Sequence, residues 1–519
     1  MKKKYNILFI ITDQQRKDTL GCYDNELIRT PHIDKLAAEG IQFNKAYCES
    51  PICMPSRATL HTGKKAIHHG VTHHNDSMRP DEQTIAHVLA EKGYVTKCIG
   101  KMHLTSQQHR GREESIADWR DGVYKEWQGP YYGYQTADLI LGHSNSLVGH
   151  YGNWLREHYP EARHRFVVEN MEKLPVSSGQ GVYNNDIPES LHSSSFVGDR
   201  TVKFLQDMKE SGKPFFCFAS FPDPHWPIMP PKAYYEMYDD VAMPPQAPDN
   251  GEADKHNYPR QFGMLKRDKK NAYDGGGHYV NDQTEIEAIM RPYWGAVSWI
   301  DVQVGKMLQT LKELEMEEDT IVIFTTDHGE YMGAHGMMAK GGFVWEELIN
   351  VPLIIRCPDL IPAGQRTDAL FSFIDVVPTL LDLLEVAPST LAPDGVSQKS
   401  VLTGDREMLR DRLTVTHFGK GDASMNPDIH SLITPEWKLN YYAGDDNGEL
   451  YNLKEDPQEM NNLYHDPGLE SLQRELIRKL LDELILVKDK SYEHRIKDAD
   501  RYGKHAMHYE EWKSELEGV

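Results

Sequence analysis

The chain has 519 residues, of which 39% are hydrophobic and 26% are charged, a composition typical of a globular protein with a large core. These values exclude a disordered, collagen-like or coiled-coil chain, and the length predicts several domains or one large α/β body with an accessory domain. The formal net charge of −22 argues against nucleic acid or another large polyanion as a partner, although a small anion can bind where positive charge is concentrated.

The N-terminal residues combine three lysines with an apolar run at 7–11. This run is shorter than the apolar core of a signal peptide, about 7–15 residues, and polar residues follow it directly. No later stretch approaches the roughly 20 apolar residues of a membrane span. We therefore expect a cytoplasmic protein with no membrane partner. The six cysteines show no metal-binding or redox spacing, so free and mostly buried thiols are expected.

The first element expected is a strand at 6–12, a continuous apolar run of the kind found in parallel strands buried on both faces. It is followed by a helix at 85–89, strands at 94–99 and 215–221, a helix at 297–311 and a second buried strand at 320–326. Such alternation predicts an α/β fold with a mostly parallel central sheet flanked by helices. Asp13 and Asp327 each follow one of the two buried strands, so we expect them at the same carboxyl edge of the sheet.

Two long segments between these elements differ in composition. Residues 118–159 are rich in Tyr, Trp, Gly and His and are expected to wall a pocket. Residues 239–282 contain several prolines and glycines and few apolar residues, which is typical of a functional lid or of a disordered loop.

The C-terminal part predicts a second, smaller domain. A strand at 351–356 and a helix at 375–384 close the large domain, and a proline-containing stretch continues to Gly395. We expect a catalytic domain at 1–395 and an α+β domain at 396–519, with short strands at 413–417, 431–434 and 437–442 and a helix at 469–486. The charged tail from residue 489 is interpreted either as a solvated surface helix or as a contact of a homo-oligomer.

Acidic residues at the predicted sheet edge indicate metal chemistry. Asp13 alone fits a strand-end cap as well as a metal ligand, and the pair Asp327-His328 is not diagnostic by itself. Together they offer hard oxygen ligands and one imidazole, a set that suits Ca²⁺, Mg²⁺ or Mn²⁺. The nitrogen ligand favours Mn²⁺.

The segment at 50–63 places a cysteine at the predicted start of a helix. Pro55 fits the first helical turn and Gly63 the end of the helix. Cys53 then lies just ahead of the N-terminus, where free N–H groups and the helix dipole favour an anion. Arg57, one turn into the helix, is able to reach back to an oxyanion. The alternative interpretation of Cys53 is a small buried hydrophobic residue.

The residues Cys53-Met54-Pro55-Ser56-Arg57 match the C-x-P-S-R signature of the type I, formylglycine-dependent sulfatases. Further segments resemble motifs of that family, in the family's order and over most of the large domain: 11–14, 30–37, 100–104, 220–227, and 326–330 with Lys340 and 347–353. The chain is therefore similar to sulfatases in several separate motifs.

The resemblance implies an alkaline-phosphatase-like fold for the large domain and a modified nucleophile. A separate maturase would oxidise Cys53 to formylglycine (3-oxoalanine), whose hydrate carries two hydroxyls on one carbon. One hydroxyl would attack sulfur and expel the alcohol, and loss of the proton from the other would regenerate the aldehyde and release sulfate. A divalent metal would assist as a Lewis acid.

The resemblance also assigns roles residue by residue. The metal, Ca²⁺ or Mn²⁺ with Mg²⁺ as a further option, would be held by Asp13, Gln14, Cys53, Asp327 and His328. The sulfate oxygens would be clamped by Arg57, Lys101 and Lys340. His103 would accept the proton of the second hydroxyl or hold the hydrate, and His225, with Lys340, would donate to the leaving oxygen or bind the ester.

Two metal positions depart from the commonest family pattern. Many members carry an aspartate where this chain has Gln14 and an asparagine where it has His328. The combination found here resembles the branch that contains choline sulfatases and phosphonate monoester hydrolases. It removes one carboxylate, which makes calcium less secure as the metal and manganese more plausible.

The leading hypothesis is a sulfuric ester hydrolase that acts on a small aryl, alkyl or sugar sulfate. The alternative keeps the same site but hydrolyses phosphonate monoesters or phosphodiesters. A catalytically silent binding protein would show losses among the metal and clamp residues, and the sequence shows none. A zinc phosphatase of the same fold would need a serine or threonine nucleophile, which the C-x-P-S-R segment argues against.

Substrate contacts beyond the reacting group are expected from aromatic and histidine residues. A sugar or aryl ring is expected to stack on the aromatic residues Trp119, Trp127, Tyr131, Tyr132 and Trp154. The histidines at 68, 69, 73 and 74 fit no standard zinc spacing and are interpreted as pocket wall or surface, with His69 expected to reach the substrate.

Overall fold

The computed structural model describes residues 3–143, 146–176, 181–246, 278–280, 282–387, 390–419 and 428–502, with side chains up to residue 486. The chain forms two compact units, Met1–Tyr464 and His465–Val519. The domain boundary predicted at residue 395 stays a prediction. Most of the proline- and glycine-rich segment at 239–282, expected to be a lid or a disordered loop, lies outside the described residues.

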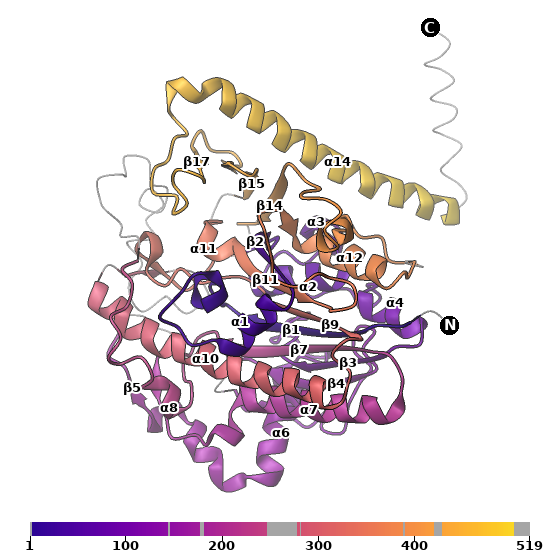
Figure 1. Cartoon of the computed structure of the whole chain (residues 1–519), viewed down its shortest axis with the longest axis vertical. Coiled ribbons are helices and arrows are strands. Elements are labelled where there is room, and N and C mark those ends of the chain that lie inside the picture. Colours follow the sequence, from indigo (N-terminus) through magenta and orange to yellow (C-terminus); the bar gives the residue numbers. More distant parts are fainter. Residues whose placement is uncertain are drawn as a thin grey trace. The chain divides into compact units, whose positions relative to one another are not determined.

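The first unit contains a nine-stranded sheet within the described part of the chain (Figure 1). Eight strands follow the order β12 (Gln365–Thr367), β2 (Ile41–Tyr47), β11 (Asn350–Arg356), β9 (Thr320–Thr326), β1 (Asn6–Asp13), β7 (Phe215–Pro224), β3 (Val95–Gly100) and β4 (Thr136–Leu141), and β13 (Phe371–Ser372) also pairs with β2. Only β11 runs antiparallel to its described neighbours. The predicted mostly parallel sheet is therefore confirmed, with the central strands at 6–12 and 320–326.

Strand β1 is buried on both faces, which explains its unbroken apolar sequence. Ile7, Phe9 and Ile11 pack into one hydrophobic core, whereas Leu8 and Ile10 pack into a second core on the other face. The second core is covered by α7 (Ser193–Ser211) and α10 (Gln283–Glu313), which lie along the same face of the sheet (Figure 1). The first core includes residues of α2 (Cys53–Thr62), α4 (Ile85–Glu91) and α12 (Val376–Leu383).

The described part of the first unit contains further α-helices of ten residues or fewer. They are α1 (Pro31–Ala38), α3 (Ala66–His69), α5 (Ile116–Arg120), α6 (Gly149–His158), α8 (Lys232–Tyr235), α11 (Glu346–Ile349) and α13 (Lys399–Leu402). Two short antiparallel pairs join β5 (Glu172–Lys173) to β6 (Tyr183–Asn184) and β8 (His278–Tyr279) to β10 (Met337–Met338). All six cysteines lie within the described residues, and none forms a disulfide, as expected.

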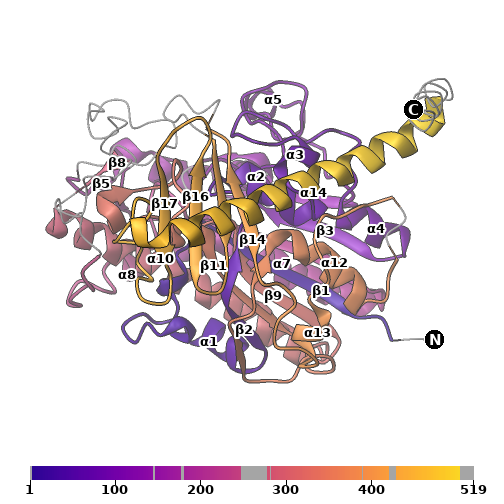
Figure 2. The same cartoon turned by 90° about the horizontal axis from the view of Figure 1, so that it is seen from above.

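The described C-terminal strands form a separate antiparallel sheet in the order β14 (Leu413–His417), β15 (Ile429–Ile433), β16 (Trp437–Tyr442) and β17 (Gly448–Asn452). Figure 2 shows the neighbouring strands β16 and β17 of this sheet side by side. The second unit contains the helix α14 (Glu470–Tyr502), which continues well past the predicted end at residue 486. Among the described residues, none of the helices has the length and apolar character required to cross a membrane.

Candidate active site

The site lies where four neighbouring parallel strands end. Asp13 is the last residue of β1, and Asp327 directly follows β9. Lys101 follows β3, and His225 follows β7. Because β9, β1, β7 and β3 are adjacent and parallel, their carboxyl ends meet at one edge of the sheet. The common edge predicted for Asp13 and Asp327 is confirmed.

Lys101 is placed by a close approach between two strands. Gly100 has φ = +98°, and its Cα faces the carbonyl of Ser220 so closely that a Cβ would overlap the carbonyl oxygen. The amide of Lys101 then donates to the same carbonyl oxygen at 3.1 Å. Glycine is thus required at position 100, where β3 ends beside β7. The turn made there places Lys101, the next residue, in the site.

Cys53 is the first residue of α2 and is only 1% exposed. The helix begins two residues before Pro55, slightly earlier than predicted, and ends at Gly63, which adopts φ = +67° and donates its amide to the Thr59 carbonyl oxygen at 2.7 Å. The hydroxyl of Ser56 donates to the Asp327 carbonyl oxygen at 2.5 Å. This bond ties the start of α2 to the sheet edge.

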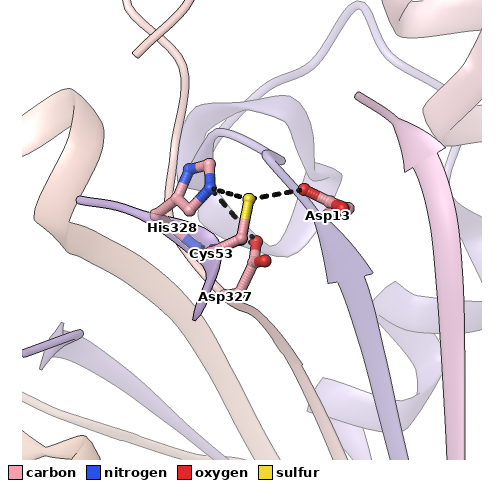
Figure 3. Close-up of side chains that lie close together, drawn as sticks. All are labelled: Asp13, Cys53, Asp327 and His328. Atoms are coloured by element: carbon pink, nitrogen blue, oxygen red, sulfur yellow. Dashed lines mark hydrogen bonds and ion pairs between the residues drawn. The ribbon is translucent and has the colours of Figure 1, made fainter. Parts of the chain in front are cut away.

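Four of the predicted metal ligands meet around the Cys53 sulfur (Figure 3). Cys53 Sγ lies 3.7 Å from Asp13 Oδ1 and 3.2 Å from His328 Nε2. The ligand atoms of Cys53, Asp13, Asp327 and His328 all lie within 4.8 Å of one another. All four residues are buried, so these groups form one compact cluster of metal-binding type.

The orientation of His328 suits a metal ligand. Its Nδ1 lies 2.8 Å from the Gly329 carbonyl oxygen, which can only accept a hydrogen bond. Nδ1 therefore carries the proton in the neutral ring, and Nε2 keeps a lone pair directed at the cluster. Burial lowers the pKa of His328 to about 4, and Lys340 acts in the same direction, so the imidazole is neutral at neutral pH.

The amide oxygen of Gln14 is a candidate for a fifth metal ligand. Its backbone, at φ = +62°, donates to Asp327 Oδ1 at 3.0 Å. The side-chain Nε2 donates to Glu330, which also accepts from Trp226 Nε1 at 2.9 Å. Gln14 Oε1 is buried and has no hydrogen-bond partner among the described residues. Two carboxylates, an unpaired amide oxygen and an imidazole nitrogen are a donor set that fits Ca²⁺, Mg²⁺ or Mn²⁺.

Three buried cations surround these ligands. Lys340 Nζ donates to Cys53 Sγ at 2.7 Å and lies 3.1 Å from His328 Nε2. Lys101 Nζ pairs with Asp13. Arg57 Nε donates to Asp327 Oδ2 at 2.7 Å, and its Nη2 lies 3.7 Å from Asp13 Oδ2. The three cations outnumber the two carboxylates, so the site attracts an anion.

These neighbours shift the ionisation of the site. Burial acts to raise the pKa of Asp13, but Lys101, His225 and Lys340 outweigh it and hold this pKa well below its usual range. Burial, followed by Asp13, raises the pKa of Cys53 to about 11, although Lys340 and Lys101 oppose the shift. An unmodified Cys53 is therefore a protonated thiol at neutral pH, which is a poor nucleophile.

Four histidines line the approach to the cluster. His225 stacks on His143 with ring centroids 3.6 Å apart, and His143 Nδ1 lies 3.4 Å from Lys101 Nζ. His103 stacks on His74 at 6.1 Å. Burial lowers the pKa of all four well below the usual value, so the rings are neutral and able to accept protons.

The loop that carries His103 is fixed by one buried carboxylate. Glu114 accepts the backbone N–H groups of His103 at 2.6 Å and of Leu104 and Thr105 at 2.8 Å. Tyr131 donates its hydroxyl to the same carboxylate at 2.9 Å. Glu114 thereby orients the segment after β3 without approaching the cluster itself.

The sequence model of the family described as Sulfatase matches residues 5–386. The chain belongs to the sulfatase family. A second model, described as N-sulphoglucosamine sulphohydrolase, C-terminal, matches residues 333–485. The chain is therefore a hydrolase of the alkaline-phosphatase-like superfamily, as its motifs predicted.

Several relatives of this hydrolase span nearly its whole length. It is 28% identical to an arylsulfatase of Clostridium perfringens, over 92% of this chain and 94% of the relative. It is 27% identical to a choline-sulfatase of Rhizobium meliloti, over 89% and 83% of the two chains. The solved phosphonate monoester hydrolase of Agrobacterium radiobacter matches with a TM-score of 0.77 at 26% identity, covering 93% of this chain and 96% of that one. Both members of the branch indicated by Gln14 and His328 are thus similar to this sulfatase.

The prediction that His69 reaches the substrate is wrong. His69 is buried between core elements, with Nε2 3.2 Å from Thr59 Oγ1 and Nδ1 accepting the Val71 amide at 3.1 Å. His74 lies beside His103 instead. The one-turn helix α3 directs the side chain of His69 towards α2, and a local run of histidines does not reveal that direction.

The aromatic wall is also smaller than predicted. Tyr131 and Tyr132 are buried, and the Tyr132 hydroxyl donates to the Met78 carbonyl oxygen at 2.6 Å. Trp154 packs on Tyr151 and Phe196. The structure contains a cavity of about 960 Å³ whose lining residues fall within 119–163. Of the five aromatic residues expected to stack on substrate, only Trp119 lines it. The prediction that residues 118–159 wall a pocket is confirmed.

His143 was missed by sequence reasoning. It lines the same cavity and contacts both His225 and Lys101. It belongs to none of the motifs, and it reaches the site because it follows β4, which pairs with β3. The only signal in the sequence was its place in the segment predicted to wall a pocket.

Proposed function

We propose that this sulfatase hydrolyses a small sulfate monoester of an alcohol, a phenol or a sugar, after a maturase has converted Cys53 to formylglycine. The observation that carries the proposal is the position of the Cys53 side chain, which contacts Lys340 at 2.7 Å inside the cluster of metal-binding groups. As a cysteine it is a protonated thiol, whereas the hydrated aldehyde supplies a hydroxyl that attacks sulfur and a second that releases sulfate.

A divalent metal fits the cluster. Asp13, Gln14, Asp327 and His328 would hold it beside residue 53, where a bound metal supplies Lewis-acid polarisation of the ester and of the attacking hydroxyl. Glu330 accepts from Gln14 Nε2, which leaves Gln14 Oε1, unpaired among the described residues, as the amide atom available to a metal.

The chain's own cations bind and stabilise the reacting group. Lys101 and Lys340 offer ammonium hydrogens on two sides of residue 53, and Arg57 Nη2 has no hydrogen-bond partner among the described residues. These donors are buried and fixed, so they stabilise charge that develops on the sulfate oxygens without reorganisation of solvent.

Protons move through the histidines and Lys340. Neutral His103, whose Nδ1 is buried without a hydrogen-bond partner among the described residues, accepts the proton of the second hydroxyl. Burial acts to lower the pKa of Lys340, but the carboxylates of Asp13 and Asp327 raise it, so Lys340 stays charged. It donates to the leaving oxygen, and His225 binds the ester beside it.

The decisive experiment begins with the mass of the tryptic peptide that contains Cys53, which should show the aldehyde after coexpression with a formylglycine-generating maturase. The converted protein is then assayed for kcat/KM on 4-nitrophenyl sulfate and on a matched aryl phosphonate monoester. Cys53→Ala serves as the inactive control, and equal activity in this variant would disprove the mechanism.

The phosphonate assay tests a second candidate function. Gln14 and His328 replace a carboxylate and an amide in the metal set, and the similar structure from Agrobacterium radiobacter is a phosphonate monoester hydrolase. A kcat/KM ratio that favours the phosphonate would assign the same site to phosphonate monoesters or phosphodiesters. A ratio that favours the sulfate supports the proposed function.

A further inference from the structure

The cavity beside His143 has a charge opposite to that of the whole chain. The chain carries a net charge of −22. The cavity of about 960 Å³, by contrast, is lined by four cationic side chains and, within the described residues, a single acidic one, Glu157. The four cations are Arg120, Lys125, Arg156 and Arg163. Such a local excess of positive charge in an acidic protein marks a binding surface for an anion.

Three of these cations have no ionic partner among the residues that the structure describes. Arg120, Lys125 and Arg163 are exposed, and none of them forms an ion pair with a carboxylate in the described part of the chain. Other arginines nearby are paired: Arg110 contacts Asp118 and Asp121. The cations of the cavity therefore repel one another and are stabilised when an anion enters.

Arg156 gives the cavity a fixed cationic point. Its Nη1 donates to the Leu147 carbonyl oxygen at 2.9 Å, and its Nη2 donates to Asn153. Burial, and then the charge of Arg163, lowers the pKa of Arg156. A guanidinium that is already oriented loses little entropy when it binds an oxyanion.

The cavity adjoins the catalytic cluster at His143. This ring lines the cavity, stacks on His225 at 3.6 Å and lies 3.4 Å from Lys101 Nζ, which in turn pairs with Asp13. An ester held at residue 53 with its alcohol extending past His143 enters the cavity. Trp119, Leu147 and Val148 supply an apolar wall there for a ring.

We infer that the alcohol part of the substrate carries a second anionic group, a sulfate or a carboxylate, and that Arg120, Arg156 and Arg163 bind it in this cavity. The inference rests on the proposed function and narrows its substrate class. A cationic alcohol is disfavoured, because it would meet four positive side chains on leaving the site.

The test compares charged and neutral versions of one substrate. The probes are aryl sulfates that carry a flexible propanoate chain at the ortho, meta or para position, each matched with the propanamide. A second series replaces the carboxylate by a sulfate ester on a chain of equal length, which distinguishes the two anions. For each pair, kcat/KM is measured on the converted enzyme at low ionic strength.

The expected result is a preference for the anionic member of at least one pair, about tenfold or more, which corresponds to one charge-assisted hydrogen bond. The double variant Arg120→Gln/Arg163→Gln, which keeps Arg156, should reduce this ratio about threefold or more. The control is Lys209→Gln/Lys213→Gln, two exposed lysines that precede β7, at the end of that strand opposite to His225. It removes the same charge and should keep the wild-type ratio.

The outcomes separate this inference from the proposed function. If the propanamide substrates are hydrolysed and no anionic member is preferred, the inference is wrong and the arginines are ordinary solvated residues. The same conclusion follows if Arg120→Gln/Arg163→Gln keeps the preference. If the converted enzyme hydrolyses none of the aryl sulfates, and Cys53→Ala does not differ from it, the proposed function itself fails.

Discussion

At the residue scale, Arg57 combines structural and catalytic demands in one side chain. It is fully buried, and its Nε and Nη1 groups are engaged by Asp327, the Lys101 carbonyl oxygen at 2.7 Å and the Ser220 hydroxyl at 2.8 Å. Nη2 alone lacks a hydrogen-bond partner within the described residues. The guanidinium thus holds three parts of the site together and leaves Nη2 for the contact with a substrate oxygen that we propose.

Replacing Arg57 by lysine should therefore damage both stability and rate. A lysine keeps the charge but offers neither the bond geometry to Asp327 and Ser220 nor the free donor. We expect Arg57→Lys to lower kcat by about 10²-fold or more. We also expect it to lower the free energy of unfolding by about 3 kcal/mol, as measured by urea denaturation.

The exposed residue Arg366 provides the matched control. It pairs with Asp24 through both terminal nitrogens, and Arg366→Lys should change the free energy of unfolding by less than about 1 kcal/mol and leave kcat unchanged. Wild-type kcat in Arg57→Lys would show that Nη2 does not contact the reacting group.

Glu330 acts on the metal site through another residue. It accepts from Gln14 Nε2 and Trp226 Nε1 with one oxygen and from the Met332 amide, at 3.1 Å, with the other. Without this acceptor the Gln14 amide is free to rotate and to present nitrogen to the metal. We expect Glu330→Ala to weaken metal affinity by about 10–100-fold, as outer ligand partners do elsewhere.

The measurement is a calorimetric metal titration of protein whose Cys53 has not been converted, so that no step depends on activity. Glu330→Gln keeps one oxygen for Gln14 and Trp226 and should retain most of the affinity. Equal affinities of the wild type and Glu330→Ala would exclude Gln14 as a metal ligand controlled by Glu330.

At the element scale, the start of α1 is held by a residue of α10. Asp301 accepts the amides of His32 at 3.0 Å and of Ile33 at 2.8 Å, and it is only 1% exposed. Burial raises the pKa of this carboxyl from 3.8 to about 7, more than the two amide donors lower it. The contribution of Asp301, which joins α1 to α10, to the free energy of unfolding therefore depends on pH.

The sign of this linkage follows from the raised pKa. The folded protein binds a proton at Asp301 more tightly than the unfolded chain, so its stabilising contribution is present near pH 4 and is lost as the pH rises to about 7. The slope between these limits is at most about 1.4 kcal/mol per pH unit. We expect the stability difference between the wild type and Asp301→Asn to fall over this range and to stay constant above pH 8.

Urea denaturation of both proteins from pH 4 to pH 9 measures this difference, and every other titrating group cancels between the two. The asparagine side chain of the variant still offers an oxygen to the amides of α1, so the helix start is kept. A difference that does not depend on pH would show that Asp301 stays ionised in the folded protein.

The elements that sequence reasoning predicted have strong local signals. Strands β1 and β9 are continuous apolar runs, and the residues after them lie in motifs, so Asp13 and Asp327 were found without a structure. Strands β2 and β4 were missed, because polar residues interrupt their apolar pattern. Helix α10 begins well before the predicted residue 297 and contains Pro292, because the apolar spacing used for the prediction starts only at Val297.

The site shows the same division. Cys53, Arg57, Lys101 and Lys340 lie in motifs, and the structure brings them together as predicted. Glu330 also lies in a motif, but its hydrogen bond to Gln14 was not predicted, and Glu114 and His143 belong to no motif. No local pattern specifies such partners, because they depend on strand order and on the direction of individual side chains.

At the scale of the whole molecule, the folded state buries Cys53, the residue that the proposed function requires a maturase to modify. All ten residues of α2 are buried, and Cys53 Sγ is enclosed by Asp13, His328 and Lys340. In this state Cys53 is not accessible to the maturase that we propose. Conversion therefore has to precede folding, or it has to wait for α2 to leave the sheet edge.

This constraint gives a prediction about when the modification takes place. Exposing Cys53 requires opening of the main core, which costs about 5 kcal/mol or more in a typical domain. The folded thiol protein should then be converted by a maturase about 10³-fold more slowly than a peptide of residues 46–66. Mass spectrometry of the Cys53 peptide over time measures both rates, and adding urea to the midpoint of unfolding should bring the rate for the protein close to that for the peptide. If the native protein is converted as fast as the peptide, α2 opens without unfolding of the core, and the buried Cys53 is accessible from the folded state.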